Sequence, residues 1–213
     1  KKTVGLPEYA SDSINVDNDP YDPVANYGTG FAPFFVSVSL WTGALSAMLA
    51  VYYDYKRRMR ILSPNSHHPI VREAGFMGLA AASALIVCGF LHLVFGMEVN
   101  NILPYYLGAV LTSMTFMAIE LCLCRHLGDI GKLLCMLFLV LQLTSCGGMF
   151  PVEMTPKFFQ VLNPFLPMTY SIQLFKETIS GHSASYMWSN ALVLIGFLVA
   201  AILITLIFDY VRP

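Results

Sequence analysis

The sequence predicts an all-helical membrane protein with five transmembrane helices and a re-entrant helical hairpin on the outer face before the last span. Hydrophobic residues make up 56% of the 213-residue chain and charged residues only 12%, against about a quarter in soluble domains. Five apolar segments approach the roughly 20 residues that a helix needs to cross a bilayer. The net charge of -1 offers no basic field for nucleic acid, so that class of partner is not expected.

Residues 1–30 are predicted to form an acidic extracytoplasmic linker. They contain several aspartates and prolines and no periodic apolar pattern, which is typical of an irregular, solvated segment. Asp17, Asp19 and Asp22 imitate part of a calcium loop, but the glycine and the final glutamate of such a loop are absent, so no metal site is predicted. Lys1 stands where an initiator methionine would, and no signal peptide is visible, so we expect a C-terminal piece of a longer chain.

Residues 31–213 are predicted to form the membrane domain, with spans at about 31–53, 76–97, 105–124, 133–150 and 191–208. Five spans place the two ends of this domain on opposite sides of the membrane. Positive charge resists translocation, and eight of the twelve Lys and Arg residues fall on one side. We therefore predict that the N-terminus is outside and the C-terminus is cytoplasmic. The eight residues are Lys56, Arg57, Arg58, Arg60, Arg72, Arg125, Lys132 and Arg212.

The segment at about 151–181 is too apolar for a loop and has too many helix breakers for a span. Thr155 suits an N-cap and Pro156 a first helical position, which predicts a short helix to about Leu162. A second short helix is predicted from about Met168 to Ser180, with Gly181 as its C-cap. Such short helices can enter the outer leaflet only if other spans shield their backbone, so we expect the hairpin to pack against the fourth and fifth spans. The residues that define it are Gly147, Gly148, Pro151, Pro156, Asn163, Pro164 and Pro167.

Two sequence blocks resemble a known family. Residues 27–35 (YGTGFAPFF) with 39–45 (SLWTGAL), and residues 147–151 (GGMFP) with 156–160 (PKFFQ) and 163–171 (NPFLPMTYS), are similar to the C-terminal membrane domain of the phage infection protein (Pip/YhgE-like) family. This resemblance implies a domain related to the permeases of type 2 ABC exporters, which have six spans and an outer re-entrant hairpin before the last one. It also implies a first span and a large external domain upstream of Lys1, and a location in the bacterial plasma membrane.

The resemblance leaves two functions open. The chain is expected to be the membrane permease subunit of an ABC-type exporter, working as a homodimer or pseudo-dimer. A separate ATPase would drive it, because the chain has no GxxxxGK[ST] motif. The alternative is a membrane anchor for a cell-surface protein used in phage adsorption or type VII secretion assembly. Neither function makes the chain an enzyme, and no cofactor is expected.

The basic loop after the first span is the predicted docking site for that ATPase. It carries Lys56, Arg57, Arg58, Arg60 and Arg72, and is interrupted by Ser63-Pro64 and His67-His68-Pro69. The competing interpretation is a solvated linker whose charges fix the orientation and touch anionic membrane lipid. Adjacent histidines without a third ligand do not predict a metal site.

Two ionisable residues fall inside predicted spans, and such residues are costly to bury. Glu120 lies about a turn from Arg125, so it is predicted either to reach the cytoplasmic interface and pair there or to line a polar path. His92 lies near the outer end of the second span, where a hydrogen-bonded packing role competes with a proton relay. Both residues are candidates for the polar path.

Small residues and cysteines complete the candidate features. Ser39, Gly43 and Ala47 share a face of the first span, and Gly78 and Ala82 share one on the second, which permits close helix contact within the chain or in a dimer. All five cysteines lie in apolar runs: Cys88, Cys122, Cys124, Cys135 and Cys146. Cys122 and Cys124 point in different directions on a helix, so no metal site is predicted there.

Overall fold

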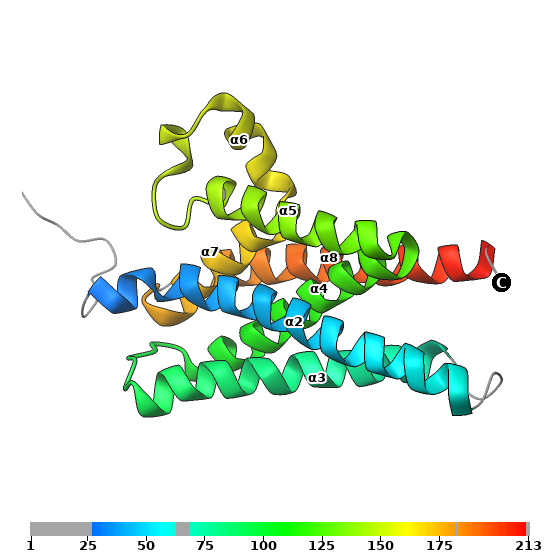
Figure 1. Cartoon of the computed structure of the whole chain (residues 1–213). Coiled ribbons are helices and arrows are strands. Elements are labelled where there is room, and N and C mark those ends of the chain that lie inside the picture. Colours follow the sequence, from blue (N-terminus) through cyan, green and yellow to red (C-terminus); the bar gives the residue numbers. More distant parts are fainter. Residues whose placement is uncertain (1–26, 63–68, 182, 212–213) are drawn as a thin grey trace, which may run out of the picture.

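The computed structural model describes residues 27–62, 69–181 and 183–211, and in these ranges every regular element is helical. Five long helices form a bundle, and a set of short helices lies between the last two of them (Figure 1). The predicted linker lies outside the described residues, except that its last four residues already belong to the first helix. The helices are α2 (Tyr27–Leu62), α3 (Pro69–Gly89), η1 (Phe90–Val94), α4 (Ile102–Leu127), α5 (Asp129–Ser145), η2 (Val152–Met154), α6 (Lys157–Leu162), η3 (Asn163–Phe165), α7 (Pro167–Ile179) and α8 (Ala184–Val211).

Four of the described helical segments are long and apolar enough to cross a membrane. They are Tyr27–Ala50, Ala74–Val94, Ile102–Leu127 and Ala184–Phe208, close to the first, second, third and fifth predicted spans. The fourth predicted span corresponds to α5, which has 17 residues and begins at Asp129 rather than at 133. Its helix ends at Ser145 instead of about 150, because Gly147 adopts a left-handed φ of 65° that breaks the helical path.

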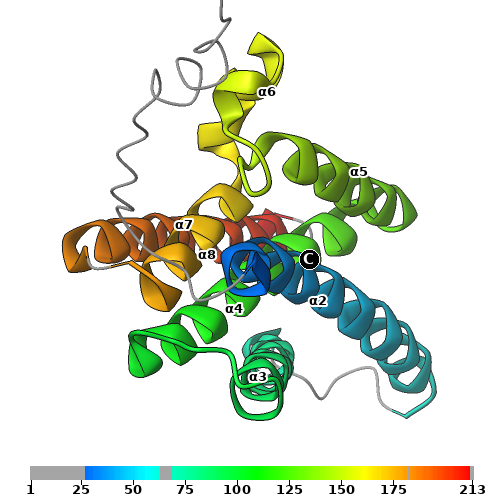
Figure 2. The ribbon, with the colours of Figure 1, turned by 90° about the vertical axis from the view of Figure 1, so that its left-hand side faces the viewer.

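Helix α4 is the centre of the bundle and contacts α2, α3, α5, α7 and α8. Figure 2 looks along the helices and shows these elements around it. Small residues allow the close approach: a Cβ atom added at Gly108 would lie 3.0 Å from Leu174 of α7. The largest side chains of the core, which include Trp41, Tyr105, Phe116 and Phe175, are fully buried. The core therefore sits where α2, α4 and α7 meet.

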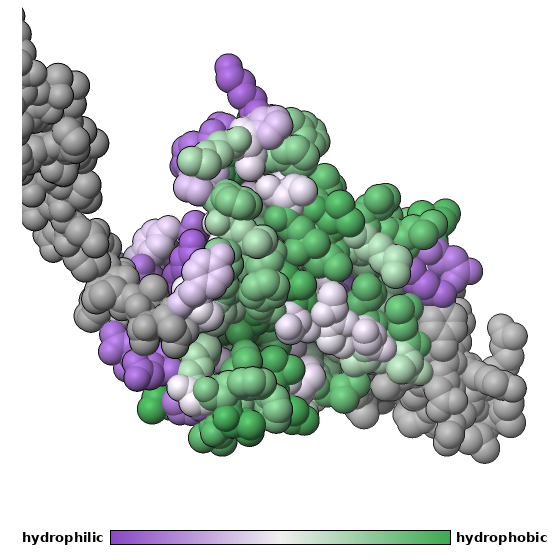
Figure 3. Space-filling view, turned by 60° about the vertical axis from the view of Figure 1, so that its left-hand side comes forward, coloured by the Kyte–Doolittle hydropathy of each residue, from purple (hydrophilic) through white to green (hydrophobic). Residues whose placement is uncertain are grey.

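The outer surface of the bundle is mostly apolar. On the face drawn in Figure 3, hydrophobic side chains cover the middle and polar ones gather toward the ends and at the tip of the α6 region. α8 is the extreme case, with Leu192, Val199, Leu203 and Ile207 each at least 48% exposed. Such a surface matches the hydrocarbon of a bilayer.

The segment between α5 and α8 contains two short helices close to the predicted ones. α6 begins one residue after Pro156, which occupies the N-cap position, while the Thr155 hydroxyl donates to the Val152 carbonyl instead of capping α6. α7 begins at Pro167, and its C-cap is Ser180 rather than Gly181. α6 contacts α5, and α7 contacts α8, α2 and α4. Nine of the 13 residues of α7 are buried, so α7 belongs to the bundle while α6 projects from it (Figure 1).

Candidate functional site

Helix α5 contacts the bundle along one narrow line of residues. Only Gly131, Cys135, Gln142 and Ser145 are buried among its 17 residues, and their spacing of three to seven residues places them on one helix face. Most of the remaining side chains, such as Leu133 and Leu137, are exposed and apolar. We call the buried contact of α5 with α2 and α4 the α5 seam. Its members named below are Trp41, Glu120, Cys124, Cys135, Gln142 and Ser145.

Glu120 is the ionisable carboxyl group of the α5 seam. Its side chain is fully buried, and neither carboxylate oxygen has a hydrogen-bond partner in the described part of the chain. Cys124 follows Glu120 by four residues on α4, which places both side chains on the same helix face. The Cys124 and Cys135 sulfurs are 3.9 Å apart and join α4 to α5. Burial of an unpaired carboxyl group costs several kcal/mol at most sites, so this position is unfavourable for packing alone.

The prediction that Glu120 reaches the interface and pairs with Arg125 is wrong for this structure. Five residues correspond to about 140° around an α-helix, so the two side chains leave α4 on different faces. Glu120 faces the core, while Arg125 is half-buried near the end of the helix. The role of Glu120 in a polar path stays a prediction.

Further polar groups of the α5 seam have no partner among the described residues. Both amide atoms of Gln142, the Ser145 hydroxyl and the Trp41 indole nitrogen are buried and unbonded. Trp41 packs on Phe116 at 5.0 Å and on Phe138 at 5.5 Å between ring centroids, which ties α2 to α4 and α5. Unsatisfied buried polar groups are rare in native proteins. Their concentration where α5 meets α2 and α4 marks this contact as the candidate site.

Sequence reasoning missed Gln142, Ser145 and Trp41. A signal was available: Gln142 follows Cys135 by seven residues and precedes Ser145 by three, inside an apolar run. That spacing puts three polar or thiol side chains on one face of a helix.

His92 lies in a different part of the bundle. It is in the π-helical turn η1, where its Nδ1 atom shares a 3.1 Å hydrogen bond with the Met97 carbonyl. Its ring meets the edge of Tyr106 at 6.1 Å, and Tyr106 precedes Glu120 by 14 residues, about 21 Å along α4. The structure therefore does not bring the two predicted path residues together.

The residues that define the hairpin fix the ends of its segments. A Cβ atom at Gly148 would collide with the Phe34 ring and the end of Ile172, so only glycine fits there. Asn163 donates from Nδ2 to the Ser145 carbonyl and accepts from the Thr169 hydroxyl at its own carbonyl, which links α5, η3 and α7. The prolines lie at segment starts: Pro151 before η2, Pro156 before α6, Pro164 within η3 and Pro167 at the first position of α7.

The predicted docking residues lie where α2 ends and α3 begins, and the structure describes only their backbone. Lys56, Arg57, Arg58 and Arg60 are in the last part of α2, and Arg72 is in the first turn of α3. Their side chains and residues 63–68 lie outside the described parts.

The two glycines of the small-residue faces have open space beside them in the described chain, while Ala47 packs against the core. A Cβ atom at Gly43 or Gly78 would meet no described atom within 4 Å, so close packing within the chain is not observed there. Cys122 does not join Cys124, which contacts Cys135 instead. In the described ranges no group of three His, Cys, Asp or Glu residues could hold a metal ion.

Comparison with known proteins identifies the relatives of this chain. The family model described as "ABC-2 family transporter protein" matches residues 5–207. The chain is 35% identical over 200 residues to YhgE, an uncharacterized protein of Bacillus subtilis (strain 168). That match covers 94% of this chain and 25% of YhgE, so the chain spans about a quarter of the relative's length. No solved structure gives a significant match.

These matches confirm the resemblance to YhgE-like proteins. Together with the four long apolar helices of the described ranges, they make this a multi-pass membrane protein. The chain belongs to the ABC-2 transporter family.

Proposed function

We propose that the chain is the membrane permease half of an exporter, in which two copies form a path and a separate ATPase drives outward movement. The substrate class expected from the sequence is a lipid-linked, peptide or drug-like molecule. Membership of the ABC-2 transporter family supports the permease role.

The buried, unpartnered carboxyl group of Glu120 is the observation that carries this proposal. A membrane anchor needs only apolar contacts between its helices, and ionisable residues inside a membrane are a mark of function. In a permease, separation of α5 from α2 and α4 would expose Glu120, Gln142 and Ser145 to water or cargo. α5 is held to the bundle by a single buried face, so we infer that this is the contact that opens.

The topology that we propose has five spans, including α5, with the N-terminus outside. At 17 residues, α5 is about 25 Å long, somewhat short for a hydrocarbon core of about 30 Å. The α4–α5 turn and the C-terminal ends of α2 and α8 lie at the same end of the bundle (Figure 1). The sequence places eight of the twelve Lys and Arg residues in segments that belong to this end of the bundle. Because positive charge resists translocation, this supports a cytoplasmic location for this end. The α6–α7 hairpin then enters from the outer face.

The docking segment for the ATPase is the inner end of α2 with the start of α3. α2 continues for 12 residues past Ala50, the end of its apolar part, which corresponds to about 18 Å of helix beyond the membrane. This extension carries Lys56, Arg57, Arg58 and Arg60. A rigid helical extension would transmit a push from a soluble subunit to α2.

The dimer contact that we propose uses the face of α2 formed by Ser39, Gly43 and Ala47. This face is at least partly exposed, and the space beside Gly43 is open, so a helix of a second copy could approach it closely.

The experiment that tests the proposal places single cysteines in a full-length, cysteine-free protein in native membranes. Lys56→Cys, Arg60→Cys and Arg72→Cys are compared with Lys157→Cys, which lies at the start of α6 at the opposite end of the bundle. After mild crosslinking and affinity purification, we expect a nucleotide-binding subunit with ATPase activity on the first three variants and not on the control. Replacement of the basic residues by glutamine should lower its recovery.

The alternative function is a membrane anchor for a cell-surface protein, and the same experiment tests it. The chain spans only 25% of its relative YhgE, and a large remainder is what an anchored surface protein would need. Recovery of only the protein itself, or of secretion or cell-wall components, from all positions would refute the exporter proposal.

A further inference from the structure

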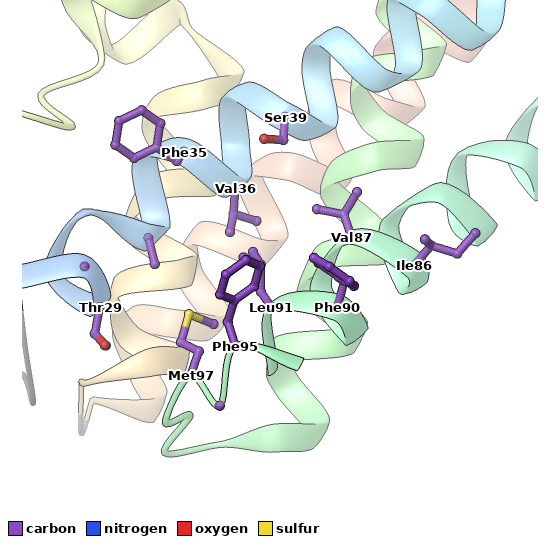
Figure 4. A pocket seen from close by; sticks show the side chains of 13 residues that line it. Thr29, Phe35, Val36, Ser39, Ile86, Val87, Phe90, Leu91, Phe95 and Met97 are labelled. Carbon is purple, nitrogen blue, oxygen red and sulfur yellow. The ribbon is translucent and has the colours of Figure 1, made fainter. Parts of the chain in front are cut away.

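A groove of about 610 Å³ lies between α2 and the C-terminal part of α3 with η1. Val36 of α2 forms its floor and is 1% exposed. Val87 and Leu91 face Val36 from the other wall (Figure 4). The rim consists of exposed aromatic rings, with Phe35 at 56% and Phe90 at 53%. The groove is therefore apolar inside and open on its side.

The local backbone creates this space. Phe90–Val94 form a π-helical turn, which widens the helix and is often found at functional sites. The chain then reverses at Gly96 with a φ of 63° and lines one end of the groove. On the opposite wall, Gly28, Ala32 and Ser39 of α2 leave room because their side chains are small. The π-helical turn on one wall and the small side chains on the other therefore leave space at the same level of the bundle.

The groove lies at the depth of the membrane, so lipid is what surrounds its open side. Its walls lie mainly within two of the membrane-spanning segments, Tyr27–Ala50 and Ala74–Val94. Between Gly28 and Ser39 it follows eleven residues of α2, which is about 16 Å. Half of the hydrocarbon core of a bilayer is about 15 Å thick. The groove therefore has the length and polarity of one leaflet's hydrocarbon chain.

A helix of a second copy is the competing occupant of the groove, and the crosslinking outcomes below distinguish it from a lipid chain. An extended hydrocarbon chain is thinner and needs no hydrogen-bond partner from the wall. Its burial against the apolar wall is favourable.

We propose that this groove binds one acyl chain of a membrane phospholipid, taken from the leaflet on the side where α2 begins. The chain lies along α2 from Gly28 to Ser39, between Val36 on one side and Val87 and Leu91 on the other. It is a resident ligand, held in place by a shaped site and not exchanged as freely as the lipid around α8. This binding does not depend on export, so either function proposed above is compatible with it.

Photo-crosslinking tests the site. The full-length protein is reconstituted in vesicles of phosphatidylglycerol and phosphatidylethanolamine containing a trace of phospholipid with a diazirine on the acyl chain. After illumination, adducts are mapped by mass spectrometry. We expect peptides with Val36, Val87 and Leu91 to carry about tenfold more adduct than the exposed α8 position Leu203, which corresponds to about 1.4 kcal/mol of preference.

Two filling variants and one control make the test specific. Ala32→Trp should abolish the enriched adducts, and Ser39→Phe, at the exposed inner end of the groove, should reduce them with less risk to folding. Leu203→Trp, on the lipid-facing surface of α8, should leave them unchanged. Adducts spread evenly over α8 and the groove, or enrichment that survives both filling variants, would overturn the proposal. Ser39 stands where the groove borders the proposed dimer face, so the decisive positions are Val36, Val87 and Leu91. Crosslinks between two copies at these three residues would assign the groove to a dimer contact and also overturn the proposal.

Discussion

Replacement of Glu120 by methionine should stabilise the protein and impair its function. Methionine has a similar length and fills the same space without a polar group. Both carboxylate oxygens of Glu120 are buried and unbonded, and an unsatisfied buried group costs about 1–3 kcal/mol. Its removal should raise the melting temperature by about 2–12 °C, at roughly 2–4 °C per kcal/mol for a chain of this size.

The assay is thermal unfolding of the purified protein in lipid nanodiscs. Glu98→Gln is the control, because Glu98 is exposed in the turn between η1 and α4. Its replacement should change the free energy of unfolding by less than about 0.5 kcal/mol, so the melting temperature should hardly move. A lower melting temperature for Glu120→Met would refute the reasoning. It would mean that the carboxyl group has a stabilising partner in the assembled protein.

A second readout separates a functional role from a packing role without knowledge of the substrate. In a cysteine-free background, Glu120→Cys should react with a membrane-impermeant thiol reagent while ATP is hydrolysed, and not at rest. Ala118→Cys is a matched position on α4, 3% exposed, and should stay unreactive in both states. Equal protection of both positions during turnover would exclude a path along the α5 seam.

Three further predictions concern the packing of α5 and the hairpin. Gly148→Ala should lower stability by about 1–3 kcal/mol, because overpacking against buried neighbours is costly, whereas Gly196→Ala on the open face of α8 should be neutral or stabilising in the same melting assay. Asn163→Ala should cost about 1 kcal/mol through loss of its bond to the α5 end, and hydrogen exchange should increase first around Ser145; unchanged exchange there would contradict the link. The Cys124 and Cys135 sulfurs are 3.9 Å apart, so iodine, a small oxidant that enters membranes, should oxidise the two thiols of the folded protein to a disulfide. A mass spectrum without the bridged peptide, under conditions in which iodine oxidises either thiol, would show that α4 and α5 are further apart.

The sequence predicted the helical class and the order of the helices because length and apolar content decide whether a helix can cross a bilayer. The ends of the helices were less predictable. α5 stops at Ser145 because Gly147 takes a left-handed conformation, and a sequence reveals that a glycine can adopt such a conformation but not that it does. The N-cap of α6 was misplaced by one residue for a related reason, since the Thr155 hydroxyl can bond either forward or backward and here bonds back to Val152.

The candidate site was only partly predictable. Glu120 was recognised from its charge alone, but its partner was chosen by distance along the chain, and the relevant quantity is the angle around the helix. His92 was grouped with Glu120 because both are ionisable. The structure separates them, since His92 of η1 packs beside Tyr106 at the start of α4 and Glu120 lies about 21 Å further along that helix. Gln142 and Ser145 needed the knowledge that α5 faces the bundle through one stripe, which depends on tertiary packing.

The two faces of α2 connect the site with the lipid-facing groove. Trp41 and Ser37 point toward α4, α5 and α7, where Trp41 packs on Phe138 of α5 and Ser37 accepts a 2.9 Å hydrogen bond from Ser171 of α7. Val36 and Ser39, on the neighbouring face, line the groove. A rotation of α2 large enough to release Trp41 from α5 would also move the groove wall away from Val87. Filling of the groove by Ser39→Phe should therefore alter the turnover-dependent labelling of Glu120→Cys if α2 moves as a rigid helix, and should leave it unchanged if α5 alone swings away.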